Sequence, residues 1–311
     1  YFDDIPKNEK AYTLWSIIQR GNKQIHTKCL PYTTSANTPL RQAAIEGLLV
    51  YGNKDHISVA SQHIDYEKFN LDQLGAALAE MGSRIEASHF NFNPIALDIK
   101  HDSFIEGLLI FLTKNPVKES GNYLITIALN LDNSNVNLES QEQALKAFEA
   151  GSIHFKWSKE QNKLQRFLKS NPKSSIAKEI AWTLHRLGDS KGTQFLLETP
   201  QKSYKDSKGE WKYAVSLAKL QVELNLHKDA YSVFTRSYKA IRNPQNRNRI
   251  RGEDCIWAAR AAAGARRPTE ALEWLDRSGY STKELRQYKS MPEFKPYLDR
   301  IGFEALFGTE N

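Results

Sequence analysis

The stretch "SIAKEIAWTLHRLGDS", residues 175–190, decides the fold. The apolar residues that recur in it at helical spacing are Ile176, Ile180, Leu184 and Leu187. This spacing predicts an amphipathic helix with one buried face. Gly188 follows the stripe and is expected to end the helix, because glycine adopts the left-handed conformation at little cost. A second apolar cluster, residues 195–197, comes next and stops before Pro200, so we expect a helical hairpin.

A second copy of this pattern is "LRQAAIEGLLVYGN", residues 40–53. The residues in the matching places are Leu40, Ala44, Leu48, Tyr51, Gly52 and Asn53. The two copies are 136 residues apart, which is four times 34. Thr38 and Pro39 precede this copy and predict a cap followed by a proline at the first helical position.

Weaker copies lie between these two. One stripe consists of Leu71, Leu74, Leu78 and Met81, and another of Phe104, Leu108, Phe111 and Leu112. Ser140 and Gln143 have the spacing of a capping box before a further helix. Self-similarity at such a period is typical of a solenoid, in which each hairpin buries its apolar face against its neighbours.

The pattern of residues 40–53 resembles HEAT-like repeats of the short bacterial kind, and the likeness covers roughly residues 35–200. From about residue 203 the small-residue positions change. Leu217 and Ala218 precede Ala230 and Phe234 at the intervals of a tetratricopeptide (TPR) repeat, which this part resembles. A second TPR-like copy is marked by the small or apolar residues Ala258, Ala259, Ala271 and Leu275.

The tail, residues 284–308, is similar to the closing segment of such arrays and is expected to cover the last apolar face. We therefore predict an all-α protein, an α-solenoid that forms a right-handed superhelix of stacked helical hairpins. Residues 1–200 are expected to form HEAT-like repeats, and residues 201–311 TPR-like repeats with a C-terminal cap.

Charge divides the chain unevenly. Residues 1–155 carry 13 Lys and Arg against 18 Asp and Glu, whereas the remaining residues carry 30 against 18. This asymmetry favours an acidic partner for the C-terminal half. No apolar run reaches the length of about 18 residues that a membrane span needs. The start at Tyr1, without a signal peptide, fits a processed leader or a trimmed chain, so both an exported and a cytoplasmic location stay open.

The histidines, cysteines and acidic clusters do not form a complete motif for catalysis, a metal or a cofactor. His26 and Cys29 have the spacing of metal ligands, but no second pair of ligands follows nearby. His185 is interpreted as a packed or boundary residue of its helix. The segment that begins at Asp132 departs from a calcium loop after three residues and is interpreted as a polar turn. Cys29 and Cys255 could pair only if the fold brings them together. We expect no catalytic residue, metal or cofactor, and hence no enzyme.

Two surfaces are predicted to bind a partner. The first is the groove that TPR relatives form from their first helices; the resemblance places Lys212, Val215, Lys219 and Arg260 there, together with Val222 and Ile256. Lys219 and Arg260 would make this groove positive and favour an acidic segment. The second is the arginine-rich segment 242–251, with Arg247, Arg249 and Arg251, for which an exposed charged loop is the plainer interpretation.

These patterns predict a non-catalytic scaffold that holds a protein or peptide partner, expected to be acidic, on its concave face. Two alternatives stay open. One is a helical accessory module of a larger enzyme. The other is nucleic-acid binding through the basic C-terminal half, which would weaken steeply with salt.

Overall fold

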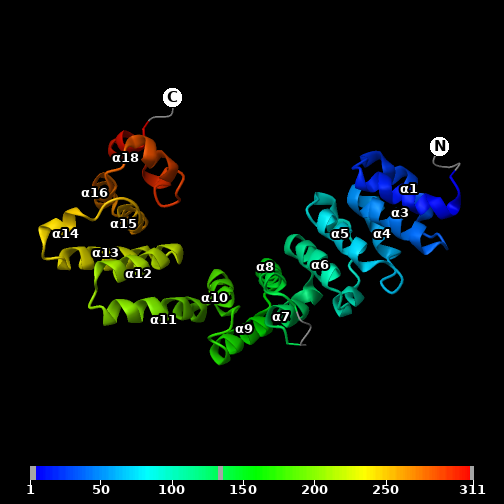
Figure 1. The fold of residues 1–311 in the computed structure, drawn as a ribbon, viewed down its shortest axis with the longest axis horizontal. Coiled ribbons are helices and arrows are strands. Elements are labelled where there is room, and N and C mark those ends of the chain that lie inside the picture. Colours follow the sequence, from blue (N-terminus) through cyan, green and yellow to red (C-terminus); the bar gives the residue numbers. More distant parts are fainter. Residues whose placement is uncertain (1–4, 132–135, 309–311) are drawn as a thin grey trace. The chain divides into compact units, whose positions relative to one another are not determined.

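The structure is a computed structural model that describes residues 5–131 and 136–308. Within these ranges it consists of α-helices and short 3-10 helices joined by turns, without β-strands. The chain forms two compact units, Tyr1–Asp189 and Ser190–Asn311. In each unit, helices that follow one another in the chain pack side by side (Figure 1), which confirms the predicted all-α, solenoid-like fold class.

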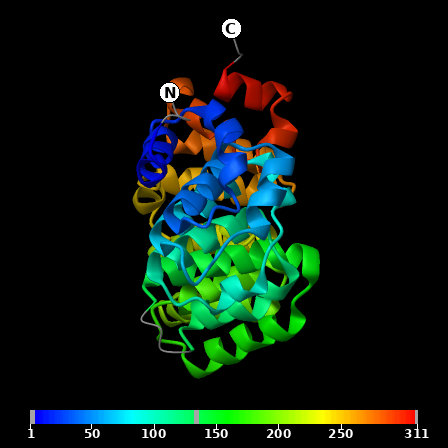
Figure 2. The same ribbon diagram turned by 90° about the vertical axis from the view of Figure 1, so that its right-hand side faces the viewer.

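The first unit stacks its helices in chain order. Its α-helices are α1 (Lys7–Gln19), α2 (His26–Cys29), α3 (Thr38–Tyr51), α4 (Lys54–Gln62), α5 (Leu71–Gly82), α6 (Asp102–Lys114), α7 (Gly121–Leu129), α8 (Leu138–Phe155), α9 (Ser158–Ser170) and α10 (Ala177–Arg186). Helix α1 packs on α3, α3 on α5, α5 on α6, and α6 on α8. Helix α8 also contacts α7 and α10, and α9 lies against both of these (blue to green in Figure 2).

The second unit contains two stacked hairpins. Its α-helices are α11 (Ser190–Asp206), α12 (Trp211–Glu223), α13 (His227–Ala240), α14 (Pro244–Asn248), α15 (Glu253–Gly264), α16 (Pro268–Ser278), α17 (Thr282–Leu285) and α18 (Ile301–Phe307). Helix α12 pairs with α13, and α15 with α16; α15 also packs on both helices of the preceding hairpin. Helix α11 covers α12 at one end, and α18 covers α16 at the other.

The repeating apolar stripes form the core as predicted. In the two best-matched copies Leu40, Leu48, Ile180 and Leu184 are all fully or almost fully buried. The stripes of α5 and α6 are buried in the same way, apart from the half-buried Leu71 at the start of α5. Burial of these stripes supplies the main force that stacks the helices, at about 25 cal/mol per Å² of apolar surface.

The turn that ends α10 forms as expected. Gly188 has a φ of +80°, and its amide donates to the carbonyl of His185 at 2.8 Å. The amide of Asp189 reaches back to Leu184 at 2.8 Å, which satisfies a carbonyl that the helix end would leave free. The matching Gly52 differs, because its φ is −69° and α4 follows almost at once. The two repeat copies therefore share their buried stripe but not their turn.

Two predicted helix caps are wrong by one or more residues. Asn37, and not Thr38, caps α3: its side chain accepts the amide of Leu40 at 3.0 Å. Asn137 caps α8 by accepting the amide of Ser140 at 2.7 Å, so Ser140 lies inside the helix instead of beginning it. Asparagine and serine have similar capping preferences, and sequence alone does not separate neighbouring candidates. The segment beginning at Asp132 falls largely on residues 132–135, outside the described ranges.

Helices α5 and α6 approach each other through glycines. A Cβ placed on Gly107 would collide with the backbone of Gly75, and one placed on Gly75 would lie 2.9 Å from the Cα of Phe104. Gly82 repeats the contact further along, where an added Cβ would lie 2.8 Å from the Cα of Phe111. The two backbones can touch only because these positions lack side chains.

The division between the two units falls between α10 and α11 in the chain. The predicted division at residue 200 falls inside α11, which continues through Pro200 to Asp206. The hairpin expected around Gly188 therefore has its first helix in one unit and its second helix in the other.

Small residues and aromatic residues build the second unit. The TPR-like positions of α12 and α13, among them Ala218, Ala230 and Phe234, are all buried. The equivalent alanines of α15 and α16 are buried too. Phe294, Phe303 and Phe307 of the tail belong to the same hydrophobic core, so the tail closes this end as predicted. None of the helices in the described ranges combines the length and apolar character that crossing a bilayer requires.

Candidate partner-binding site

The groove residues expected on α12 and α15 are only partly accessible. Val215 is 7% exposed, and Val222 and Ile256 are buried still more deeply in the core. The cause is that α12 packs against both α13 and α15, which leaves little of its surface uncovered. Val215 therefore belongs to the core and not to a binding surface, contrary to the prediction. Lys212 is exposed, with its ammonium 5.9 Å from the ring centre of Tyr213.

The structure brings the two other groove cations, Lys219 and Arg260, to the same side chain, Trp257. The Lys219 ammonium lies 5.7 Å from a ring centre of Trp257, and the Arg260 guanidinium 4.2 Å. Each also has its own carboxylate: Lys219 lies 3.5 Å from Asp254, and Arg260 lies 3.0 Å from Glu293. Their positive charges are thus largely compensated within the chain.

The arginine-rich segment is folded onto the protein rather than extended. It contains the short helix α14, and Arg247 donates from Nε to the carbonyl of Ile241 at 2.7 Å. Arg251 donates to the carbonyl of Arg277 at 3.1 Å. Arg249 alone of the three is exposed without a side-chain bond in the described residues. Two of the three arginines therefore hold the segment in place.

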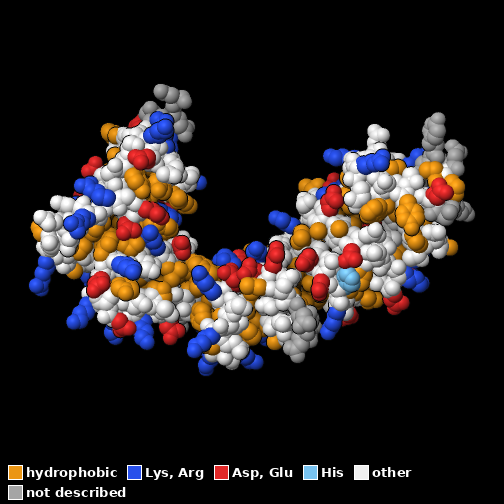
Figure 3. Space-filling model, viewed as in Figure 1, with side chains coloured by type: hydrophobic (Ala, Val, Ile, Leu, Met, Phe, Trp, Pro, Cys, Tyr) orange, Lys and Arg blue, Asp and Glu red, His pale blue; other side chains and the backbone are white. Residues whose placement is uncertain are grey.

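Figure 3 shows how charge is distributed over the visible face of the second unit. Lys and Arg side chains lie apart from one another, with acidic and hydrophobic side chains between them. Nucleic acid wrapping favours a continuous basic stripe, and this face does not carry one.

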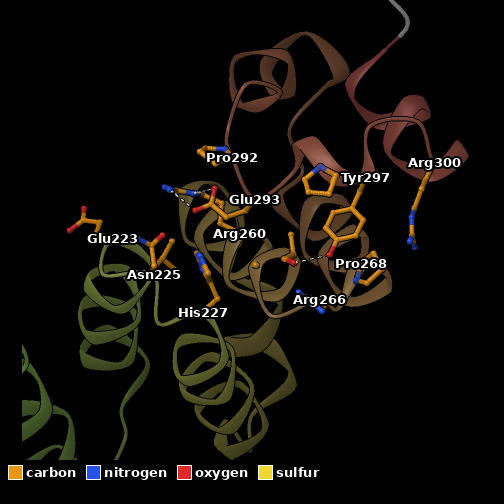
Figure 4. A pocket seen from close by; sticks show the side chains of 14 residues that line it. Glu223, Asn225, His227, Arg260, Arg266, Pro268, Pro292, Glu293, Tyr297 and Arg300 are labelled. Carbon is orange, nitrogen blue, oxygen red and sulfur yellow. Dashed lines mark hydrogen bonds and ion pairs between the residues drawn. The ribbon is translucent and has the colours of Figure 1, made fainter. Parts of the chain in front are cut away.

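The second unit does contain a pocket of about 800 Å³ (Figure 4). It lies where the α12–α13 turn, the C-terminal end of α15 and the tail come together. The side chains that line it are Val222, Glu223, Asn225, His227, Arg260, Ala263, Gly264, Arg266, Pro268, Pro292, Glu293, Pro296, Tyr297 and Arg300. Val222 and Arg260 are the lining residues that also belong to the predicted groove.

Two left-handed turn residues shape the pocket. Asn225 has a φ of +58° and lies in the turn that follows α12, and Arg266 has a φ of +63° and lies in the turn that follows α15. Asparagine tolerates this conformation better than arginine does. Gly264 lets the ring of His227 approach closely, since a Cβ on Gly264 would lie 2.5 Å from its Nδ1. The sharp turns therefore shape the hairpin ends, and the missing side chain of Gly264 makes room for the His227 ring.

The tail forms the opposite wall of the pocket. Phe294 is fully buried and anchors this segment in the core. Tyr297 donates its hydroxyl to the carbonyl of Ala263 at 3.2 Å, which ties the tail to the end of α15. Glu293 pairs with Arg260 through two contacts, from Nη2 at 3.0 Å and from Nε at 3.3 Å. Such paired donors fix the orientation of both side chains.

His227 lies beside this ion pair (Figure 4). Burial lowers the pKa of His227, the Glu293 carboxylate opposes that effect, and the Arg260 guanidinium adds to it. Its Nδ1 is buried and has no hydrogen-bond partner in the described residues. The imidazole is therefore neutral near pH 7 and contributes a polar ring, not a charge, to the pocket.

Two further arginines give the pocket a positive side. Arg266 and Arg300 are exposed, and neither has a carboxylate partner among the described residues. The Arg300 guanidinium lies 5.0 Å from the ring centre of Tyr297. Figure 4 shows both arginines on the side of Tyr297 and Pro268, away from Glu223. A ligand on this side meets two guanidinium groups that are free to form ion pairs.

Most of these residues were missed from the sequence. His227, Glu293, Arg266, Tyr297 and Arg300 come from turns and from the tail, which carry no periodic pattern. The tail itself was predicted to close the array. Its prolines, Pro292 beside Glu293 and Pro296 beside Tyr297, are the sequence feature that could have indicated a rigid segment here.

Other chemistry-bearing residues do not assemble into a site. In the described ranges no three His, Cys, Asp or Glu side chains are placed to hold a metal ion. His26 contacts His56 with ring centres 5.1 Å apart, and His185 packs edge-on to Trp182 at 5.8 Å. His185 is half-buried, in agreement with its prediction as a boundary residue.

The two cysteines do not form a disulfide. Cys29 and Cys255 are both free and buried, and they belong to different units. Burial raises the pKa of each thiol to about 12, which makes both poor nucleophiles near neutral pH.

Comparison with known proteins adds no relative: no protein-family model, curated protein or solved structure matches this chain.

Proposed function

We propose that this protein is a non-catalytic scaffold of helical repeats, HEAT-like in the first unit and TPR-like in the second. The pocket of the second unit binds an acidic segment of a protein partner. The resemblance of the repeats to these two classes supports the scaffold role, since stacked hairpins present rigid surfaces that lose little entropy on binding.

The observation that carries the proposal is that two arginines without a carboxylate partner in the described residues, Arg266 and Arg300, line a pocket of about 800 Å³. Proline rings and Tyr297 give the same pocket apolar surface. An acidic segment with an apolar or aromatic side chain satisfies both features. Guanidinium groups bind carboxylates in a bidentate manner, which favours this partner over an uncharged one.

The binding test uses charge reversal with a matched control. Wild type and the double variant R266E/R300E are immobilised and exposed to extract of the native host. The control is R236E, because Arg236 is exposed on α13 and does not line the pocket. We expect a stoichiometric protein partner on wild type and R236E, and its loss from R266E/R300E. Retention of nothing by wild type, or equal retention by all three proteins, contradicts the proposal.

A further inference from the structure

The first unit contains a second cavity, of about 620 Å³, that the proposed function does not use. It lies between α1, α3 and the beginning of α5. The residues that line it are Ala11, Tyr12, Trp15, Thr38, Pro39, Gln42, Ala43, Lys68, Asn70 and Gln73.

Aromatic side chains form one wall of this cavity. Tyr12 is 77% exposed and Trp15 is 38% exposed, which is unusual for such large rings. The two residues are three apart on α1, so they project from the same side of the helix. Pro39 adds an exposed ring from the first turn of α3. The wall offers flat apolar faces to a ligand.

Two side-chain amides of the cavity, those of Asn70 and Gln73, have engaged oxygens and keep their N–H donors, while the hydroxyls of Tyr12 and Thr38 can both donate and accept. The Oδ1 of Asn70 accepts the amide of Gln73 at 3.1 Å. The Oε1 of Gln73 lies 3.3 Å from Nε2 of Gln42 and is the most distant of three acceptors around that amino group. The orientation of the Gln42 side-chain amide is fixed, because its Oε1 accepts the amide of Asn70 at 2.8 Å while its Nε2 donates to Glu46 at 2.6 Å and to the carbonyl of Asn70 at 2.9 Å. The groups left without a partner in the described residues are the amino groups of Asn70 and Gln73 and the indole N–H of Trp15.

Lysine supplies the charge at the edge of the cavity. Lys68 is the one lining residue that is charged at neutral pH, and its ammonium lies 3.4 Å from Asp65. The same carboxylate receives Arg41 at 2.9 Å. One carboxylate thus faces two cations, and the cavity edge carries no surplus of negative charge. These surroundings suit a ligand that presents hydrogen-bond acceptors and has apolar faces.

We propose that this cavity binds a proline-rich segment of a partner protein in the polyproline II conformation. Proline has no amide N–H, and a polyproline II helix makes no internal hydrogen bonds, so its carbonyls are free acceptors. Its rings pack against aromatic faces in known grooves of this kind. A carbohydrate that stacks on Trp15 is the competing ligand, and the tests below distinguish it from a proline-rich segment. This site is independent of the pocket in the second unit.

The first test measures binding of a capped deca-proline peptide to the whole chain by calorimetry and tryptophan fluorescence. A Gly/Ser peptide of equal length is the control ligand. We expect saturable binding of deca-proline alone, weakened by at least about tenfold in W15A, because central aromatic residues dominate such interfaces. The control variant is Y213A, since Tyr213 is 37% exposed, much like Trp15, and lies in the other unit. It should bind as wild type does.

The second test removes the donors without disturbing the fold. N70D keeps the oxygen that caps α5, and Q73E keeps the oxygen that accepts from Gln42. A carboxylate in the first turn of a helix is also favourable, so both variants should fold. We expect each to weaken deca-proline binding by about fivefold, roughly the effect of one lost hydrogen bond. Three results would overturn the proposal: no saturable deca-proline binding, unchanged affinity in both variants, or binding of cellotetraose or chitotetraose in its place.

Discussion

Glu293 of the tail and Arg260 of α15 form a two-contact ion pair in which the side chains are 7% and 14% exposed. The pair joins the closing segment of the second unit to the second hairpin and forms one edge of the pocket. Structure and proposed function therefore depend on the same contact.

Breaking this pair on one side should destabilise the second unit. E293Q leaves the Arg260 guanidinium nearly buried without a counter-charge, and we expect a loss of about 3 kcal/mol in the free energy of unfolding. The double variant R260M/E293M buries no charge and should lose clearly less. Urea denaturation measures both, and an equal loss in the two variants would contradict the assignment.

The glycine contact between α5 and α6 predicts a second stability effect. Alanine normally favours a helix over glycine by about 1 kcal/mol. G107A should nevertheless destabilise the first unit by about 1–3 kcal/mol, because its methyl group has no room beside Gly75. E106A, at the exposed neighbouring position, is the control and should change stability little. A G107A protein as stable as wild type would show that the helices do not touch there.

Glu46 makes the first unit sensitive to alkaline pH. Burial raises the pKa of this carboxyl from its ordinary 4.5 to about 7, although the hydrogen bond from Gln42 acts in the opposite direction. The stabilising contribution of the protonated form is complete below about pH 4.5 and is lost as the pH rises through 7. E46Q keeps an acceptor for Gln42, so its thermal midpoint should fall less than that of wild type between pH 6 and 8.5. Parallel curves for the two proteins would exclude this role.

His227 predicts the opposite trend in the acidic range. Its pKa is lowered below the ordinary 6.5, chiefly by burial, so its contribution is complete above 6.5 and is lost as the pH falls further. We expect H227Q to lose less stability than wild type between pH 7 and 5. The pKa values of His56 and His185 are lowered too, so a residual slope should remain. H154Q, at an exposed position, is the control, and a slope in H227Q as steep as that of H154Q would refute the assignment.

The fold could be predicted because its signals are local. Each helix carries its own apolar stripe. Residues such as Leu48 and Ile180 can therefore be recognised as core residues without knowledge of the helix that packs on them. The positions of single caps were less predictable, since Asn37 and Thr38 are adjacent and both suit a helix start.

The site could be predicted only in part because its residues are far apart in sequence. Arg260 was found from the TPR-like spacing, but Glu293 and Arg300 come from the tail, where no periodicity links them to α15. Val215 was assigned to the groove because the TPR repeats that this part resembles expose the matching position, whereas here the contact between α12 and α15 buries it.

The location of the bound partner is the central claim, and hydrogen–deuterium exchange of the captured complex tests it most directly. The proposal predicts slower exchange around residues 223–227, 263–268 and 292–300, whose side chains form the pocket. It also predicts that the R236E complex shows the same pattern. Protection confined to other segments, with these three unchanged, would contradict it.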